Sequence, residues 1–324
     1  MAKKIINISG VSDSISQHIK EDLNAEESLD KSKFLAGKKI AISISESEDL
    51  ELLGFSDAHQ QDAMIEFARY MLVQGGTLIY GGDLRKEGYT LLFSELSFQY
   101  RDRSQHKKSH FINYSSYPIY LSTTKTQELE FRKNRVEFKK IAPPKSVKPV
   151  SETWFAPDTL ENKLTWSVSL KKMREEMNNA TDARIFLGGR SQGYSGIMPG
   201  VLEEAILSFE SNKPTYLIGA FGGITSAIIK ALNGQEPKEI TEMFQFSNAN
   251  YKEFITHLRK NKKDNIDYSE IIKFLQNHGI EKLSKANGLT KEENQILFTT
   301  PHIPVMIHYV LKGLSIVFNK DNTK

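Results

Sequence analysis

The chain has 324 residues, with 43 Lys and Arg against 40 Asp and Glu, and its formal net charge is only +3. This near balance argues against a nucleic-acid partner, and the absence of cysteine excludes disulfides and thiolate metal sites. The eight histidines show no metal-binding spacing, and no apolar stretch reaches the ~20 residues of a membrane span. We therefore expect a cytoplasmic protein with no metal, no cofactor and no membrane partner.

The first half of the chain alternates strand-like and helix-like patterns after a polar extension at residues 1–36. The apolar run Ile40–Ile44 is the first expected strand, and Asp57 is expected to cap the helix that follows it. Later elements of this half are a strand T-L-I-Y ending at Gly81-Gly82, a helix Tyr89–Tyr100, a strand F-I-N-Y-S-S-Y-P-I-Y-L and a polar helix Gln127–Lys140. A proline-containing loop, I-A-P-P-K-S-V-K-P-V, then interrupts regular structure.

The stretch Asp182–Gly223 has the pattern of a βαβ unit. Two apolar runs, Ala183–Leu187 and Thr215–Ile218, are each followed at once by glycines, and apolar residues at helix spacing lie between them. In a parallel sheet both Gly-rich loops then lie at the carboxyl ends of their strands, which is where open α/β sheets bind ligands. This edge is the expected functional region.

The pattern changes after Gly234, where Asn233-Gly234 is a C-cap signal. The remaining chain has helix patterns and no Gly-rich strand ends, and Thr290 with Glu293 forms a capping box at the start of one helix. We therefore expect an α/β protein with a Rossmann-like, doubly wound parallel sheet in residues 37–234 and a helical C-terminal extension in residues 235–324. That extension either covers the sheet or makes an oligomer contact.

Three glycine pairs follow expected strands, and together they indicate a nucleotide or phosphate site. A single pair is weak evidence, because a tight turn between a strand and a helix also selects glycine. Three pairs at one edge favour close approach of the backbone to a ligand, with arginines beyond two of the pairs to bind phosphate. The expected ligand-binding residues are Ser45, Gly81, Gly82, Arg85, Gly188, Gly189, Arg190, Gly200, Glu203, Glu204, Phe221, Gly222 and Gly223.

The segment P-G-V-L-E-E places Glu203 and Glu204 in the first turn of a helix. Carboxylates there stabilise the helix dipole, which is a purely structural role. They would also face the ligand, where an acid can accept ribose hydroxyls or act as a general acid or base. Neither a phosphate-binding P-loop motif nor a complete G-x-G-x-x-G is present.

The segment M-R-E-E-M-N-N-A-T-D-A-R-I-F-L-G-G-R, followed by M-P-G-V-L-E-E-A and P-T-Y-L-I-G, resembles the SLOG superfamily. This superfamily includes the lysine-decarboxylase-like phosphoribohydrolases that activate cytokinins, DprA, and the ADP-ribose-sensing domain of TRPM channels. The residues that match the hydrolase motifs are Met177, Asp182, Ala183, Gly188, Gly189, Gly200 and Glu204. In this chain Met173-Arg174 stands where the hydrolases have Arg-Lys, and an insertion R-S-Q-G-Y-S-G-I-M-P splits the glycines.

The insertion and the loop L-I-G-A-F-G-G look closest to SLOG domains associated with TIR and Sir2 enzymes in antiphage defence. This resemblance implies a sensor that binds a nucleotide of the ADP-ribose or cyclic ADP-ribose type, in a homo-oligomer with a TIR or Sir2 effector as partner. The alternative that it implies is an N-glycoside hydrolase acting on a nucleoside monophosphate or an NAD-derived nucleotide, with Glu204 as the catalytic acid. The altered glycine motif favours binding over catalysis.

Overall fold

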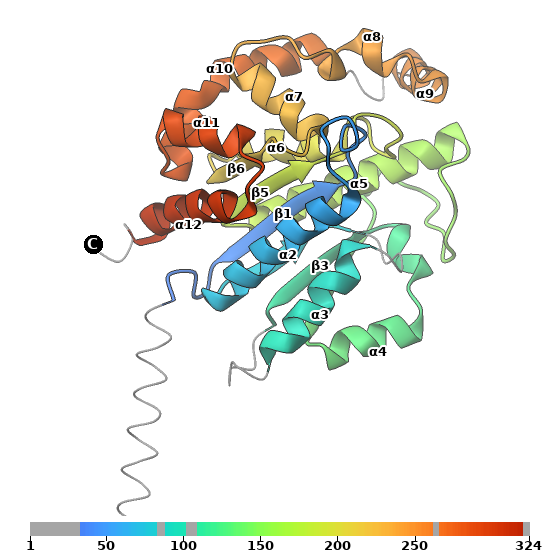
Figure 1. The fold of residues 1–324 in the computed structure, drawn as a ribbon. Coiled ribbons are helices and arrows are strands. Elements are labelled where there is room, and N and C mark those ends of the chain that lie inside the picture. The colour runs from blue at the N-terminus through green and yellow to red at the C-terminus, as the bar shows by residue number, and fades with distance from the viewer. Residues whose placement is uncertain (1–32, 83–87, 102–108, 262–265, 320–324) are drawn as a thin grey trace, which may run out of the picture.

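The computed structural model describes residues 33–82, 88–101, 109–261 and 266–319. Its centre is a six-stranded parallel sheet, within these residues, in the order β4-β3-β2-β1-β5-β6 (Figure 1). The strands are β1 (Lys39–Ser45), β2 (Thr77–Tyr80), β3 (Phe111–Ser116), β4 (Val136–Ile141), β5 (Ala183–Gly188) and β6 (Thr215–Ile218). The expected Rossmann-like α/β fold is confirmed.

Strands β1 and β5 form where short apolar runs are buried on both faces, as in parallel sheets generally. The chain builds β2, β3 and β4 outward on one side of β1 and then crosses to β5 on its other side. Strand β1 pairs with β5 in register, with Ile42 opposite Ile185. The order of strands therefore reverses between β1 and β5, and ligands bind at such a switch point in open α/β sheets.

Helices cover both faces of the sheet. Against one face pack α2 (Asp57–Val73), α3 (Tyr89–Arg101) and α12 (Ile303–Asn319), with side chains such as Phe67, Phe93 and Met306 in the core. Against the other face pack α5 (Leu160–Ala180), α6 (Gly200–Glu210) and α7 (Gly223–Leu232). Alternation along β1 and β5 sends Ile42 and Ile185 to the first face, and Ser43 and Arg184 to the second.

The C-terminal helices contribute side chains to the cores on both faces of the sheet. These helices are α8 (Glu242–Gln245), α9 (Ala249–Lys260), α10 (Tyr268–Asn287), α11 (Lys291–Thr299) and α12. Helix α10 lies against α7, whereas α12 lies against α2. The expected capping box of α11 is present, since Thr290 Oγ1 accepts from the Glu293 amide and Glu293 accepts from the Thr290 amide. None of the helices in the described ranges is long and apolar enough to cross a membrane.

Three expectations about the first half are wrong. The strand expected over F-I-N-Y-S-S-Y-P-I-Y-L ends at Ser116, and Ile119–Ser122 form a 3-10 helix after Pro118, which has no N–H group to donate to a strand ladder. The helix at Gln127–Lys140 is in fact α4 (Lys125–Lys133) followed by the edge strand β4. Lys139 and Lys140 make the sequence of β4 polar, so it lacks the apolar pattern of a buried strand. Charges of this kind are common on edge strands, because they prevent pairing with other chains. A stacked ring pair, Phe131 and Phe138, joins the helix to the strand at 5.4 Å.

The third wrong expectation concerns the start of α2. Its N-cap is Ser56 rather than Asp57, and Ser56 forms a capping box with His59. Asp57 is instead the first helical residue, where its charge faces the helix dipole.

Candidate functional site

A cavity of about 250 Å³ lies at the carboxyl end of β1, beside the switch point. Its walls come from the ends of β1 and β2, one side of α5 and the first turn of α6. Six of the expected residues line it: Ser45, Gly81, Gly82, Arg190, Gly200 and Glu204. These residues are spread over 160 positions of sequence, and the parallel sheet brings them to one edge.

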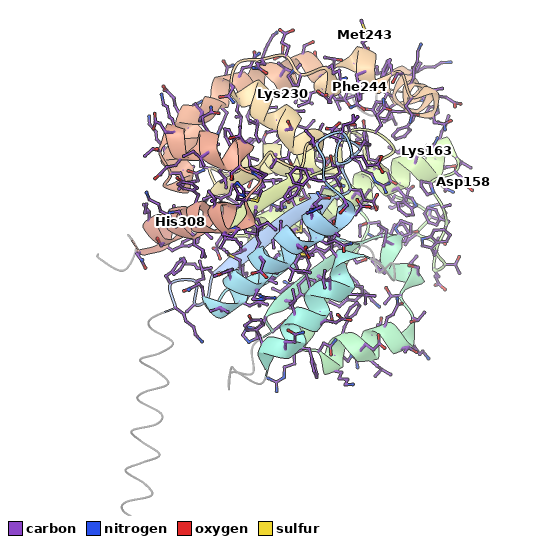
Figure 2. All side chains as sticks on the ribbon, in the orientation of Figure 1. Asp158, Lys163, Lys230, Met243, Phe244 and His308 are labelled. Carbon is purple, nitrogen blue, oxygen red and sulfur yellow. The ribbon has the colours of Figure 1, made fainter. Side chains whose placement is uncertain are left out.

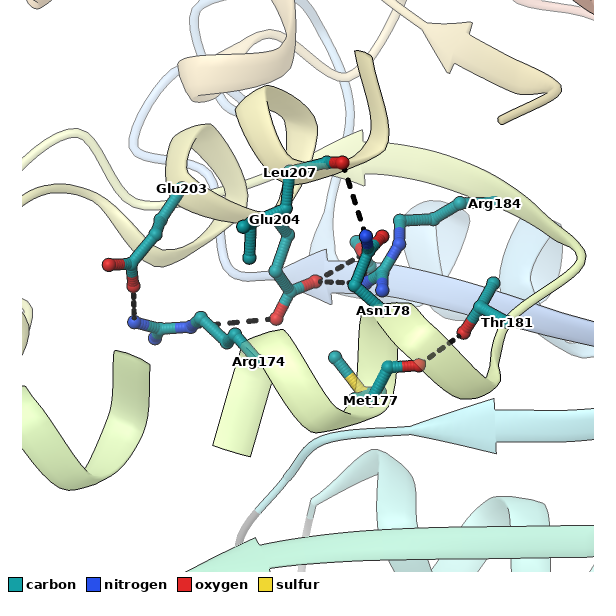
Figure 3. A network of polar contacts seen from close by, with 9 residues as sticks. Arg174, Met177, Asn178, Thr181, Arg184, Glu203, Glu204 and Leu207 are labelled. Atoms are coloured by element: carbon teal, nitrogen blue, oxygen red, sulfur yellow. Dashed lines mark hydrogen bonds and ion pairs between the residues drawn. The ribbon is translucent and has the colours of Figure 1, made fainter. Parts of the chain in front are cut away.

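Glu204 is held in place by buried partners on the sheet (Figure 3). Its Oε2 atom accepts a hydrogen bond from the Ser43 hydroxyl and another, 2.8 Å long, from Arg184 Nη1. The same Arg184 nitrogen donates to Ser43 Oγ at 3.0 Å, so the three side chains form a closed triangle. Oε2 is thereby fixed toward the sheet, whereas the other carboxylate oxygen, Oε1, points toward α5.

Arg184 is the largest fully buried side chain of the described protein, with 0% of its surface exposed. Burial lowers the pKa of Arg184, and the neighbouring Glu204 carboxylate opposes that shift. Its Nε and Nη2 atoms have no hydrogen-bond partner among the residues described. A buried guanidinium of this kind depends on its single carboxylate, so Arg184 and Glu204 must be considered as a pair.

Arg174 approaches Glu204 from the other side. It projects from α5, donates from Nη1 to Glu203 Oε2 at 2.5 Å, and places Nε 3.6 Å from Glu204 Oε1. A Cβ atom on Gly200 would lie only 2.5 Å from Arg174 Nη2. Position 200 therefore has no room for a side chain, because the Arg174 guanidinium occupies that space.

The sequence interpretation missed Arg174 and the aromatic part of the cavity. Arg174, Tyr80, Trp166 and Tyr194 all line the cavity beside Glu204. The signal for Arg174 was its place in M-R-E-E-M, three residues before Met177 in the segment that resembles SLOG proteins. The aromatic residues carried no signal, because their positions depend on how α5 and the loop after β5 fold over the edge.

The other two glycine pairs lie outside the described lining of this cavity. Gly188 and Gly189 have positive φ angles, and a Cβ atom there would meet Gln60 at 2.1 Å or Ile224 at 2.7 Å. Gly222 and Gly223 also have positive φ angles, and their contacts are with Asp49 and with the Gly189 carbonyl. These pairs allow neighbouring loops to pack tightly against one another.

The loop after β1 supplies carboxylates to the neighbouring loops. Glu46 pairs with Arg190, Glu48 accepts from the Ser191 amide at 3.3 Å, and Asp49 accepts from the Gly223 amide at 2.8 Å. The first N–H group of α7 is therefore satisfied by Asp49 of this chain. By contrast, the N-cap of α6 is Pro199, which provides no side-chain cap, and the first turn of this helix faces the cavity.

The remaining expected residues have other surroundings. Glu203 is occupied by its ion pair with Arg174. Phe221 is buried, and its ring packs edge-on with that of Phe55, with 5.4 Å between the ring centroids. Arg85 lies outside the described residues. Within the described ranges, no three His, Asp or Glu side chains are grouped so that they could hold a metal ion.

Comparison with known proteins gives a family for this fold and site. No curated protein matches the chain. The family model of SLOG cluster2 matches residues 34–297, which is most of the chain and includes the whole sheet and the cavity. The resemblance to the SLOG superfamily is thus confirmed, and the chain belongs to the SLOG cluster2 family.

Proposed function

We propose that the cavity beside Glu204 binds a nucleotide of the ADP-ribose type, and that the protein acts as a sensor of it. One observation carries this proposal: a guanidinium, a fixed carboxylate and aromatic rings line the same cavity at the switch point of the sheet. SLOG membership supports a nucleotide-related ligand. The cavity chemistry matches the parts of such a ligand one by one.

Each part of a nucleotide has a counterpart in the lining. Arg174 and Arg190 offer cations for phosphate, and the uncapped first turn of α6 adds backbone N–H groups. Glu204 Oε1 can accept hydrogen bonds from ribose hydroxyls. Tyr80, Trp166 and Tyr194 offer apolar ring surfaces on which a base can stack.

The cellular role is a further part of the proposal and rests on the resemblance of the insertion Arg190–Pro199 and the loop that ends in Gly222-Gly223. We propose that the ligand is a signal in antiphage defence, that the protein works as a homo-oligomer in the cytoplasm, and that a TIR or Sir2 effector is its partner. The absence of cysteine is compatible with a reducing compartment.

The test is calorimetric titration of the protein with AMP, ADP-ribose, NAD and the cyclic ADP-ribose isomers. The Arg174→Gln variant is expected to bind the tightest of these ligands about 10- to 100-fold more weakly, because it loses a charge-assisted hydrogen bond to phosphate. The matched control is Lys172→Gln, which removes the same charge from a partly exposed position on α5 outside the described lining of the cavity. Equal affinity in the two variants would show that Arg174 does not contact the ligand.

Glycoside hydrolysis is the second candidate, because Glu204 and Arg174 line one cavity. The geometry favours binding, since Glu204 Oε2 already accepts from Ser43 and Arg184. We expect no free base and no ribose phosphate when the wild-type protein is incubated with each nucleotide and the mixture is separated by chromatography. Release of either product would move the protein to the hydrolase class.

A further inference from the structure

A second cavity of about 260 Å³ adjoins the first. Tyr194 and Ser195 line both cavities, so these two residues form a shared wall. The second cavity lies between the start of α5, the loop after β5 and the start of α9. Lys163 of α5, which is labelled in Figure 2, lines this cavity.

The sizes of the cavities indicate that one ligand uses both. Small-molecule sites usually enclose about 300–1,000 Å³. Each cavity alone, at about 250 and 260 Å³, is below this range, and the two together are within it. A ligand made of two compact parts joined by a narrow linker would fit this shape, with the linker passing Tyr194 and Ser195.

The chemistry of the second cavity differs from that of the first. Its lining includes the amide side chains of Gln192, Asn248 and Asn250 and the rings of Tyr251 and Phe254. Lys163 is the only charged side chain among the described residues that line it. This surface has no carboxylate to repel phosphate, and it offers amides and rings to a sugar or a base.

The shared wall is fixed by a cluster of tyrosine hydroxyls. Tyr194 donates to Gln245 Oε1 at 2.7 Å, and its hydroxyl lies 3.2 Å from that of Tyr268. Tyr251 donates to the Ile197 carbonyl at 2.5 Å, and its hydroxyl lies 2.6 Å from the same Tyr268 oxygen. Burial raises the pKa of Tyr194 and of Tyr268, so both remain protonated and neutral. The loop that separates the cavities is therefore anchored to α8, α9 and α10.

We propose that the second cavity binds the distal half of an extended nucleotide, a linear nucleoside diphosphate that carries a second sugar or nucleoside. The proximal half occupies the cavity beside Glu204, so this inference rests on the proposed function. It assigns to the C-terminal helices a direct part in selecting the ligand. AMP, which has only one of the two halves, uses the first cavity alone.

The experiment compares AMP and linear ADP-ribose by calorimetry on four proteins, the wild type and three variants. Asn250 is exposed and lines the second cavity, so Asn250→Trp fills that cavity without disturbing the core. Lys252→Trp is the matched control, because Lys252 is an exposed residue of α9 outside the described lining of the cavity. Lys163→Met is a second test variant, on a different element.

We expect wild-type protein to bind ADP-ribose at least tenfold more tightly than AMP. Asn250→Trp should weaken the binding of ADP-ribose at least tenfold and leave the affinity for AMP unchanged. Unchanged AMP binding also shows that the variant is folded. Lys163→Met should weaken the binding of ADP-ribose alone, by a smaller factor. Lys252→Trp should change the affinity for neither ligand. If Asn250→Trp binds both ligands like wild type, the second cavity plays no part and the proposed function still stands. If wild-type protein binds neither ligand, the proposed function fails and this inference fails with it.

Discussion

Replacing Arg184 with Met is expected to lower the free energy of unfolding by about 3–5 kcal/mol, the usual cost of breaking a buried ion pair. Arg184 is fully buried and pairs with Glu204 at 2.8 Å. Without the guanidinium, Oε2 of Glu204 keeps only the Ser43 hydroxyl in a site that is mostly closed to water. Urea denaturation of both proteins measures the difference.

A second variant shows whether this loss comes from the unpaired charge. Changing Arg184 to Met and Glu204 to Leu together removes both charges, and replacement of a buried ion pair by apolar residues is often neutral. We expect the double variant to recover most of the stability that the single variant loses. A loss below about 1 kcal/mol in Arg184→Met would mean that the pair does not stabilise the fold.

The second large effect is expected at the loop where β5 and α7 meet. Gly223→Ala should cost about 2–4 kcal/mol, which combines the strain of a positive φ angle with overpacking. Gly223 has a φ angle of 62°, and its Cβ would lie 2.4 Å from the Gly189 carbonyl oxygen. Backbone atoms of a sheet edge cannot move aside as the end of a long side chain can.

Gly234→Ala is the matched control for this substitution. Gly234 has a similar φ angle of 83°, but a Cβ atom there would meet nothing within 4 Å among the described residues. The control is expected to cost only about 1 kcal/mol, from the backbone conformation alone. Equal losses in the two variants, measured by urea denaturation, would show that the contact with Gly189 contributes nothing.

The sheet and most helices could be predicted because their signals are local. Apolar runs closed by glycines mark β5 and β6, and the capping box of α11 is formed by two residues only three positions apart. The strand β4 could not be predicted in this way. Its pairing with β3 is a tertiary contact, and its lysines are selected by its position at the edge.

The location of the candidate site, at the carboxyl edge of the sheet, could be predicted from the sequence. The contacts between its side chains could not. Glycine pairs identify tight turns after strands, but they do not say what fills the space that a side chain would take. At Gly200 that space holds the Arg174 guanidinium, and at Gly223 it holds another loop. Arg184 gave no signal, because its partner Glu204 meets it only when α6 lies across the sheet.

The position of Trp166 gives the protein a built-in optical probe. The chain has two tryptophans, and one of them, Trp154, is 48% exposed. Trp166 lines the cavity with its ring, while its indole nitrogen donates to the Phe155 carbonyl at 3.1 Å. In a protein with Phe in place of Trp154, all tryptophan emission comes from the cavity wall. If a nucleotide base stacks on that ring as proposed, its binding is expected to quench the emission, and the rates of ligand binding and release can then be followed by stopped-flow fluorescence without attaching any dye.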